Sequence, residues 1–183
     1  MGVRMSHLLS PMDEPLGRTV GNALEVAECV HILNGGGPDD LITLILDLAA
    51  AVSTVSREQL QQWLQDGTAW RKFVALVEAQ GGDATTLERM NEVHRAPLEH
   101  RVPAMRSGTI TAVDAETVGR ASVFLGGGRQ QATDAIDFAV GFSDIKKVGE
   151  HVDEGDALMT VHARNETSLA AVLPMLQQAV TIS

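Results

Sequence analysis

The feature of this sequence that most constrains its fold is a change of pattern near residue 91. Before this point, apolar residues recur at helical spacing, with Gly-rich breaks between the segments. After it, Pro97 and Pro103 stand close together, and the run 108–113 alternates between polar and apolar residues. Prolines break helices and suit extended linkers or edge strands, whereas alternation indicates a strand. The pattern predicts an α+β chain with a mainly helical domain at 1–92 and a compact α+β domain at 93–183.

Capping and breaking residues locate the helices of the first domain. Asn22 is a plausible N-cap, because its side chain can accept a hydrogen bond from a free N–H of the first turn. Ser56 and the residues after it fit a capping box, and Gly-rich stretches end the segments. The predicted helices are 22–33, 39–55, 56–66, 68–80 and 83–90. The stretch from Val3 to Leu9 fits either a short strand or a frayed terminus.

The second domain mixes strands and helices. Asp114 and Asn165 each precede an apolar helical pattern and are expected to cap it, and Pro174 lies inside the second of these helices. The remaining predicted elements are strands at 108–113 and 135–140 and a strand–turn–strand unit at 146–162. The glycine spacing of that unit is similar to that of hammerhead-like barrels such as lipoyl domains, although no carrier lysine stands at a hairpin tip.

Composition narrows the functional classes. The chain is 44% hydrophobic and 21% charged, which is typical of globular proteins. Its net charge of −10 argues against a nucleic-acid partner or an anionic membrane surface. No apolar run reaches the ~18–20 residues that span a bilayer, and no secretory signal is recognised, so we expect a cytoplasmic protein. The single Cys29 lies in a helical pattern and is predicted to be a small core residue.

Two runs carry a resemblance to a known family. The first is PLGRTVGNALEV at 15–26, which reads as a loop entering a helix that bears carboxylates. The second is LGGGR at 125–129, followed by DAIDFAVG at 134–141. Both runs, in this order, are similar to those of thymidine and pyrimidine nucleoside phosphorylases, and the resemblance extends to about Ala163. It implies the end of the family's α/β domain followed by its C-terminal hammerhead-like domain.

The resemblance also implies an activity. The family are pentosyltransferases that use phosphate as co-substrate and convert pyrimidine nucleosides to the free base and (deoxy)ribose 1-phosphate. They are homodimers, and they hold phosphate with a Lys, a Ser or Thr and a Gly-rich loop. No K-x-S/T-x-G-G-x-G-D-K run occurs in this sequence. We therefore expect no catalytic or substrate-binding residue in this chain, and no phosphorylase activity from the chain alone.

One family site maps partly onto this sequence. The resemblance implies a potassium ion held by the backbone carbonyls of Leu16 and Thr19 and by the carboxylate of Glu28. Hard cations favour such oxygen ligands. The remaining ligands would come from an upstream part of the enzyme, and Thr19 replaces the small Ala expected there. The alternative is that Glu28 is simply solvated or salt-bridged.

The motifs leave several functional interpretations open. The chain can be a truncated phosphorylase, the C-terminal half of a split enzyme with an upstream catalytic partner, or a relative that acts on nucleotides. It can also be a non-catalytic binding or assembly module that keeps the fold. Arg129 is interpreted as a structural, hydrogen-bonding residue rather than as a catalytic partner of Asp137.

Overall fold

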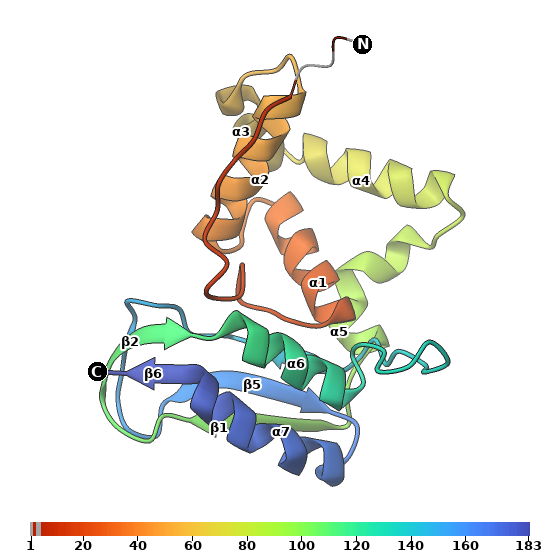
Figure 1. Ribbon diagram of the computed structural model, residues 1–183. Helices are drawn as coiled ribbons and strands as arrows, with labels where there is room; N and C mark the ends of the chain where they lie inside the picture. The colour runs from red at the N-terminus through yellow and green to blue at the C-terminus, as the bar shows by residue number, and fades with distance from the viewer. Residues whose placement is uncertain (1, 3–4) are drawn as a thin grey trace.

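The computed structural model describes residues 2 and 5–183 and confirms the predicted α+β class (Figure 1). Helices gather in the first part of the chain, and the strands and the last two helices form the second. The predicted strand at 3–9 lies partly outside the described residues, and its described part, 5–9, forms no strand. Within the part of the chain that is described, no helix is long and apolar enough to cross a membrane.

The helical part is a loose cluster with a small core. Ile32, Leu46 and Leu64 are its buried centre. Its elements are α1 (Asn22–Leu33), α2 (Asp39–Val52), α3 (Arg57–Gln65), α4 (Thr68–Ala79), the 3-10 helix η1 (Ala84–Arg89) and α5 (Met90–Val93). The Ser56 hydroxyl accepts the Gln59 N–H at 3.3 Å, as a capping residue should. Helix α2 ends before the predicted residue 55 because Ser53 is already extended.

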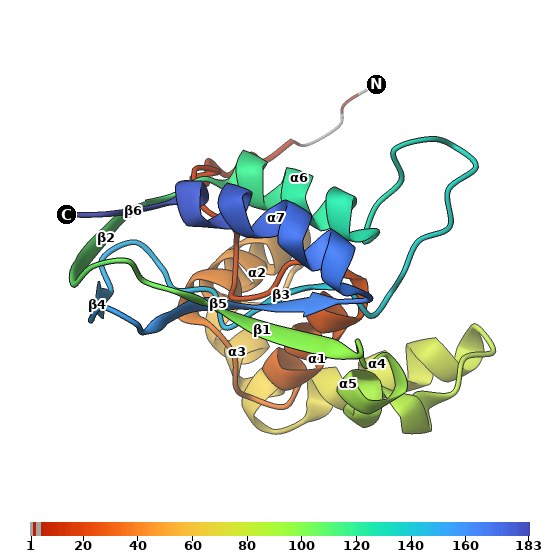
Figure 2. The same ribbon diagram turned by 90° about the horizontal axis from the view of Figure 1, so that it is seen from below.

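The second part consists of two small antiparallel sheets and a pair of helices. Its elements are β1 (Leu98–Pro103), β2 (Gly108–Val113), α6 (Ala115–Leu125), β3 (Gly141–Ser143), β4 (His151–Val152), β5 (Ala157–Ala163), α7 (Glu166–Ala179) and β6 (Val180–Ile182). The strand orders are β1-β5-β3 and β4-β2-β6. Figure 2 shows α6 and α7 on one face of the first sheet and the helical part toward the other. Phe142, Ile145, Met159 and Leu176 are fully buried in the core between sheets and helices.

Three local predictions were wrong. The segment 135–140 is irregular, because the Asp137 side chain accepts the Ala139 N–H and the Phe138 carbonyl accepts the Ala23 N–H. The strand is instead 141–143. Asn22 does not cap α1 with its side chain, which donates to the Gly127 carbonyl at 2.8 Å. Cys29 is exposed rather than buried.

The two-domain division at residue 92 stays a prediction. The last helix of the helical part ends at Val93, and β1 begins at Leu98. However, the loop that precedes α1 pairs with β3, so the N-terminal region also contacts the second part of the chain.

Candidate cation site in the loop before α1

The loop at 13–20, called here the N-terminal loop, is held by the second part of the chain. Val20 and Phe142 exchange backbone hydrogen bonds of 2.9 and 2.7 Å, and the Ile145 N–H donates to the Arg18 carbonyl at 3.1 Å. The loop thus adds an isolated bridge to strand β3. A segment with little regular structure of its own is thereby fixed by residues that lie far away in the sequence.

Gly17 allows a carboxylate to approach the loop closely. Its φ is +70°, and a Cβ built on it would lie 2.3 Å from Glu28 Oε2. No side chain larger than hydrogen fits at this position without a shift of the loop or of Glu28.

The structure places Glu28 against the loop that carries the predicted carbonyl ligands. Glu28, in the middle of α1, accepts the Arg18 N–H at 2.9 Å through Oε1 and the Thr19 hydroxyl at 3.1 Å through Oε2. Leu16 lies one residue before Gly17 in the same loop. Glu28 is therefore bound to the loop by hydrogen bonds, and it forms no salt bridge with a residue that the structure describes.

The carbonyl groups of the loop differ in how they are used. Among the described residues, no hydrogen bond is donated to the carbonyl of Leu16 or to that of Thr19. The carbonyls that accept hydrogen bonds are those of Asp13, Pro15, Gly17, Arg18 and Val20. The Leu16 and Thr19 carbonyls, which are predicted to bind a cation, are among those that accept none, and carbonyl and carboxylate oxygens are the donor type that alkali ions favour. Within the described chain, no group of three or more His, Cys, Asp or Glu side chains could hold a metal.

Lys147 anchors the same loop from the turn after β3. Its ammonium donates to the carbonyls of Pro15 and Gly17, and it lies 2.9 Å from Asp40 Oδ2 and 3.6 Å from Glu14 Oε2. Asp40 also accepts the Gly17 N–H at 3.2 Å. Partial burial on its own would raise the pKa of Asp40, but Lys147 and the neighbouring backbone N–H groups outweigh it and hold that pKa below its usual range.

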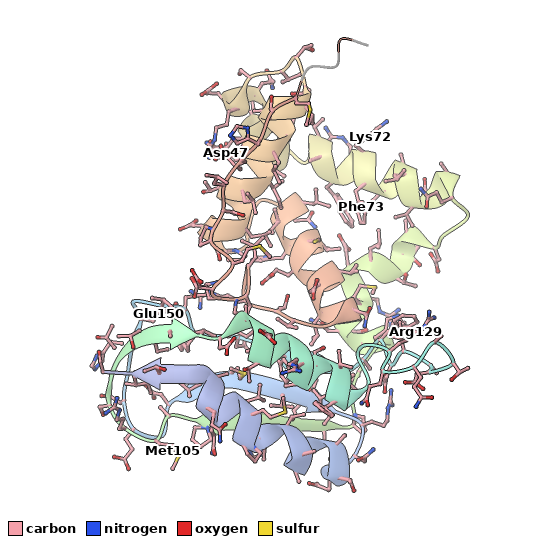
Figure 3. The ribbon with its side chains drawn as sticks, viewed as in Figure 1. Asp47, Lys72, Phe73, Met105, Arg129 and Glu150 are labelled. Atoms are coloured by element: carbon pink, nitrogen blue, oxygen red, sulfur yellow. The ribbon has the colours of Figure 1, made fainter. Side chains whose placement is uncertain are left out.

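Arg18 and Glu150 form a second clasp between the loop and the C-terminal part. The guanidinium pairs with the Glu150 carboxylate and also donates to the Ile145 carbonyl at 3.1 Å. The hydrogen bond to Glu150 raises the pKa of Arg18, and the pKa of Glu150 is lowered by Arg18 despite its partial burial. Figure 3 shows Glu150 on the side of the C-terminal part that faces the loop, with Arg129 at the opposite end.

A cavity of about 580 Å³ opens beside Glu28, between α1, α5 and the β1-β5-β3 sheet. Ser143 Oγ lies 2.9 Å from His162 Nε2 and donates to Asp144 Oδ2 at 3.0 Å. Asp144 has a φ of +55°, which is uncommon for a residue other than glycine. Burial lowers the pKa of His162, although Glu99 and Asp144 oppose this. Sequence reasoning missed this group, because no local motif links residues on different strands.

The second run that resembles the family, at 125–129 and 134–141, makes structural contacts rather than forming a reactive site. Asp137 accepts two hydrogen bonds of 2.7 Å from Arg164, and this pairing lowers the pKa of Asp137. Arg129 is exposed and makes no hydrogen bond to any residue that the structure describes, so the predicted hydrogen-bonding role of Arg129 is not observed.

Comparison with known proteins adds to this geometry. Residues 109–183 match the pyrimidine nucleoside phosphorylase C-terminal domain. The pyrimidine-nucleoside phosphorylases of Staphylococcus haemolyticus (strain JCSC1435) and Staphylococcus aureus (strain USA300) are each 35% identical to this chain over 96% of its length. The matched region is 42% of each relative, so the chain spans less than half the length of these enzymes.

Proposed function

We propose that this chain, which is similar to the C-terminal portion of pyrimidine-nucleoside phosphorylases, forms part of an enzyme that phosphorolyses pyrimidine nucleosides. In this reaction a phosphate oxygen bonds to the anomeric carbon of the pentose while the glycosidic bond to the base breaks. The bonding electrons leave with the base, which takes up a proton, and the sugar leaves as pentose 1-phosphate. Catalysis depends on positioning the reactants and on stabilising the charge that develops.

The observation that best supports a role for this chain is the hydrogen bonding of Glu28 to the N-terminal loop, which carries the Leu16 and Thr19 carbonyls. We propose that the Leu16 and Thr19 carbonyls and the Glu28 carboxylate hold a potassium ion together with ligands from another segment. A bound potassium ion would supply positive charge that helps to hold an anionic co-substrate. The chain's own contribution is the shape of the loop, which Gly17 permits and Lys147 maintains.

The residues that bind phosphate and nucleoside are proposed to come from a polypeptide that corresponds to the uncovered part of the relatives. Helices α2 and α4 offer it an apolar surface. Ten of the fourteen residues of α2 are apolar, but Leu46 is its one buried residue, and its Val52 is 88% exposed. No residue of α4, all of which are described, is buried. A homodimer and a cytoplasmic location are further proposals, both carried over from the family resemblance.

A complementation assay tests this function. The purified chain is incubated with thymidine or uridine and inorganic phosphate, and the free base is measured by chromatography. We expect no release by the chain alone, and phosphate-dependent release after co-expression with the N-terminal portion of the S. aureus relative. Robust release by the chain alone, or no release by the pair, would contradict the proposal.

Two substitutions locate the contact surface. Val52→Glu places a charge on the exposed face of α2 and is expected to weaken complementation at least several-fold, because a charge in an apolar contact is costly. Met105→Glu is the matched control, since Met105 is also apolar and 70% exposed but lies in the C-terminal part (Figure 3). Equal effects of the two variants would argue against docking on α2.

The second candidate is a non-catalytic assembly module. It is favoured by the large continuous core at 102–182, which is formed within the second part of the chain. This alternative is supported if the chain folds cooperatively, binds no nucleoside and fails to complement the N-terminal portion.

A further inference from the structure

The cavity beside Glu28 contains a hydrogen-bonded group that joins two strands of the β1-β5-β3 sheet. Ser143 Oγ, at the end of β3, lies 3.0 Å from Asp144 Oδ2 and 2.9 Å from Nε2 of His162 on β5. A carboxylate can only accept a hydrogen bond, so the single hydroxyl proton of Ser143 is directed to Asp144. The contact with His162 then requires Nε2 to carry a proton and to donate to Ser143 Oγ. These hydrogen bonds assign to the neutral His162 ring the tautomer with a bare Nδ1.

The bare nitrogen of His162 is an open hydrogen-bond acceptor. Burial lowers the pKa of this residue, so its ring is neutral at pH 7 and Nδ1 keeps a lone pair. No residue that the structure describes donates a hydrogen bond to Nδ1. Nor is this atom sealed in, since Glu150 Oε2 is the one enclosed side-chain oxygen or nitrogen of the described chain that has no hydrogen-bond partner. Because His162 lines the cavity, an occupant with an N–H or O–H group can use this acceptor.

The charged side chains of the cavity wall are only partly paired. They are Arg18, Glu28, Arg95, Glu99 and Asp144. Arg18 pairs with Glu150, and Arg95 lies 3.6 Å from Glu99. Glu28 and Asp144 accept hydrogen bonds from uncharged groups, but neither forms an ion pair with any residue in the described part of the chain. The wall therefore holds two carboxylates that a positively charged occupant would neutralise.

We propose that the cavity receives a basic side chain of the polypeptide that corresponds to the uncovered part of the relatives, and that His162 Nδ1 accepts a hydrogen bond from it. An ammonium or guanidinium group is both a hydrogen-bond donor and a cation, so it suits the open acceptor and the unpaired carboxylates together. An anion or an apolar group suits neither. This inference rests on the second polypeptide of the proposed function, but not on the potassium ion.

The size and the position of the cavity support a polypeptide as the occupant. The match covers 42% of each relative, so most residues of a relative have no counterpart in this chain. The cavity measures about 580 Å³ and lies where α1 and α5 meet the sheet, so an entering segment contacts both parts of the chain. A metal ion fits less well, because within the described chain no three His, Cys, Asp or Glu side chains are grouped to hold one.

Complex formation with the N-terminal portion of the S. aureus relative tests the inference. The two chains are co-expressed, and dilution of the purified complex in analytical ultracentrifugation gives its dissociation constant. His162→Gln keeps an N–H that can donate to Ser143 but has no acceptor at the position of Nδ1, and we expect it to weaken the complex on the order of tenfold. Asp144→Asn removes one negative charge and should weaken the complex several-fold, and asparagine tolerates the positive φ of this position.

His151→Gln and Asp153→Asn are the matched controls. The side chains of His151 and Asp153 are 66% and 79% exposed, and neither residue lines the cavity, so both variants should bind as wild type does. Circular dichroism shows whether each variant is folded at the assay temperature, and Asp144→Asn decides the test if His162→Gln is not. Binding of His162→Gln as tight as that of His151→Gln, binding of Asp144→Asn as tight as that of Asp153→Asn, or no complex with wild type would each overturn the inference.

A small amine is the competing occupant of the cavity. Ethylammonium chloride is added to the chain alone, since a ligand that binds the folded state raises the midpoint of thermal unfolding. A rise in wild type that is absent in Asp144→Asn, together with equal complex formation by both chains, would assign the cavity to a free cation and overturn the inference.

The inference and the proposed function fail in different ways. A wild-type complex that His162→Gln weakens, but that releases no base from thymidine or uridine, would refute the function and leave the inference standing. A complex that releases base, and that His162→Gln leaves as tight as wild type, would support the function and overturn the inference.

Discussion

Gly17 is the residue that lets the carboxylate of Glu28 reach the N-terminal loop. Gly149 provides a matched comparison, since it also has a positive φ, of +92°, but nothing lies within 4 Å of a Cβ built on it. We expect Gly149→Ala to cost about 1 kcal/mol of unfolding free energy from backbone strain. Gly17→Ala has the same backbone strain and also displaces Glu28. It should cost about 1–3 kcal/mol more of unfolding free energy, because the Arg18 N–H and the Thr19 hydroxyl lose their acceptor. Urea denaturation measures both losses, and equal losses would show that the Glu28 contact contributes nothing.

His162 makes stability depend on pH. Its pKa is lowered in the folded state, mainly by burial, from an ordinary value of 6.5. Below pH 6.5 the unfolded chain therefore binds more protons at this position than the folded chain does, until the pH falls below the lowered pKa. Stability should rise with pH through that window, and His162→Gln should flatten this rise. Urea midpoints between pH 5 and 7 test this, with His151→Gln as the control for loss of an exposed imidazole; an unchanged slope in His162→Gln would contradict the assignment.

At the scale of the elements, side-chain caps mark the starts of α3, α6 and α7. Asn165 accepts the Ser168 N–H at 2.9 Å and begins α7, which packs against the core through Leu169, Val172 and Leu176. Asn165→Ala is expected to cost about 1 kcal/mol, whereas Asn165→Asp keeps an acceptor and should cost less. The urea midpoint reports the difference, and an Asn165→Ala chain as stable as wild type would show that the cap is dispensable.

The start of a helix was predictable from the sequence where its capping residue lies beside it. It was less predictable where the deciding contacts involve residues far away in the sequence. Asp114 and Asn165 cap α6 and α7 as expected, because a capping side chain bonds to an N–H within three residues. The segment 135–140 was predicted to be a strand because its apolar residues resemble one. In the structure, the Asp137 carboxylate accepts a hydrogen bond from Arg164, and the Phe138 carbonyl accepts one from the Ala23 N–H. Those partners lie far off in sequence, so no local pattern reveals them.

The residues of the candidate site likewise fall into those that the sequence indicated and those that only the structure shows. Leu16, Thr19 and Glu28 were named from the family resemblance. The structure shows Glu28 bonded to the Thr19 hydroxyl, and the role of the Leu16 and Thr19 carbonyls stays a prediction. Lys147 was missed because its contacts join positions 130 and 132 residues apart. Sequence spacing carries no information about such a pair, and only the folded loop shows that one lysine serves two carbonyls and two carboxylates.

At the scale of the whole molecule, the two parts have unequal cores. The helical part buries Ile32, Leu46 and Leu64 at its centre, whereas the second part has a far larger buried cluster. We expect the helical part to unfold at lower urea. Trp63 and Trp70 both lie in it, so their fluorescence should change before the far-UV circular dichroism of the strands and of α6 and α7 is lost. Coincident transitions would instead indicate that the contacts of the N-terminal loop couple the two parts fully.

The bridge between Val20 and Phe142 also sets an order of events during biosynthesis. Helices α1 to α4 are built from local contacts and can form as soon as they leave the ribosome, because such contacts close quickly. The N-terminal loop has no such independence, since its backbone partners and Lys147 are translated more than a hundred residues later. Until then, Asp40 lacks its ammonium partner. The nascent chain thus presents an acidic loop that stays open after the helices that follow it have formed, and the loop closes only when the turn after β3 has been made.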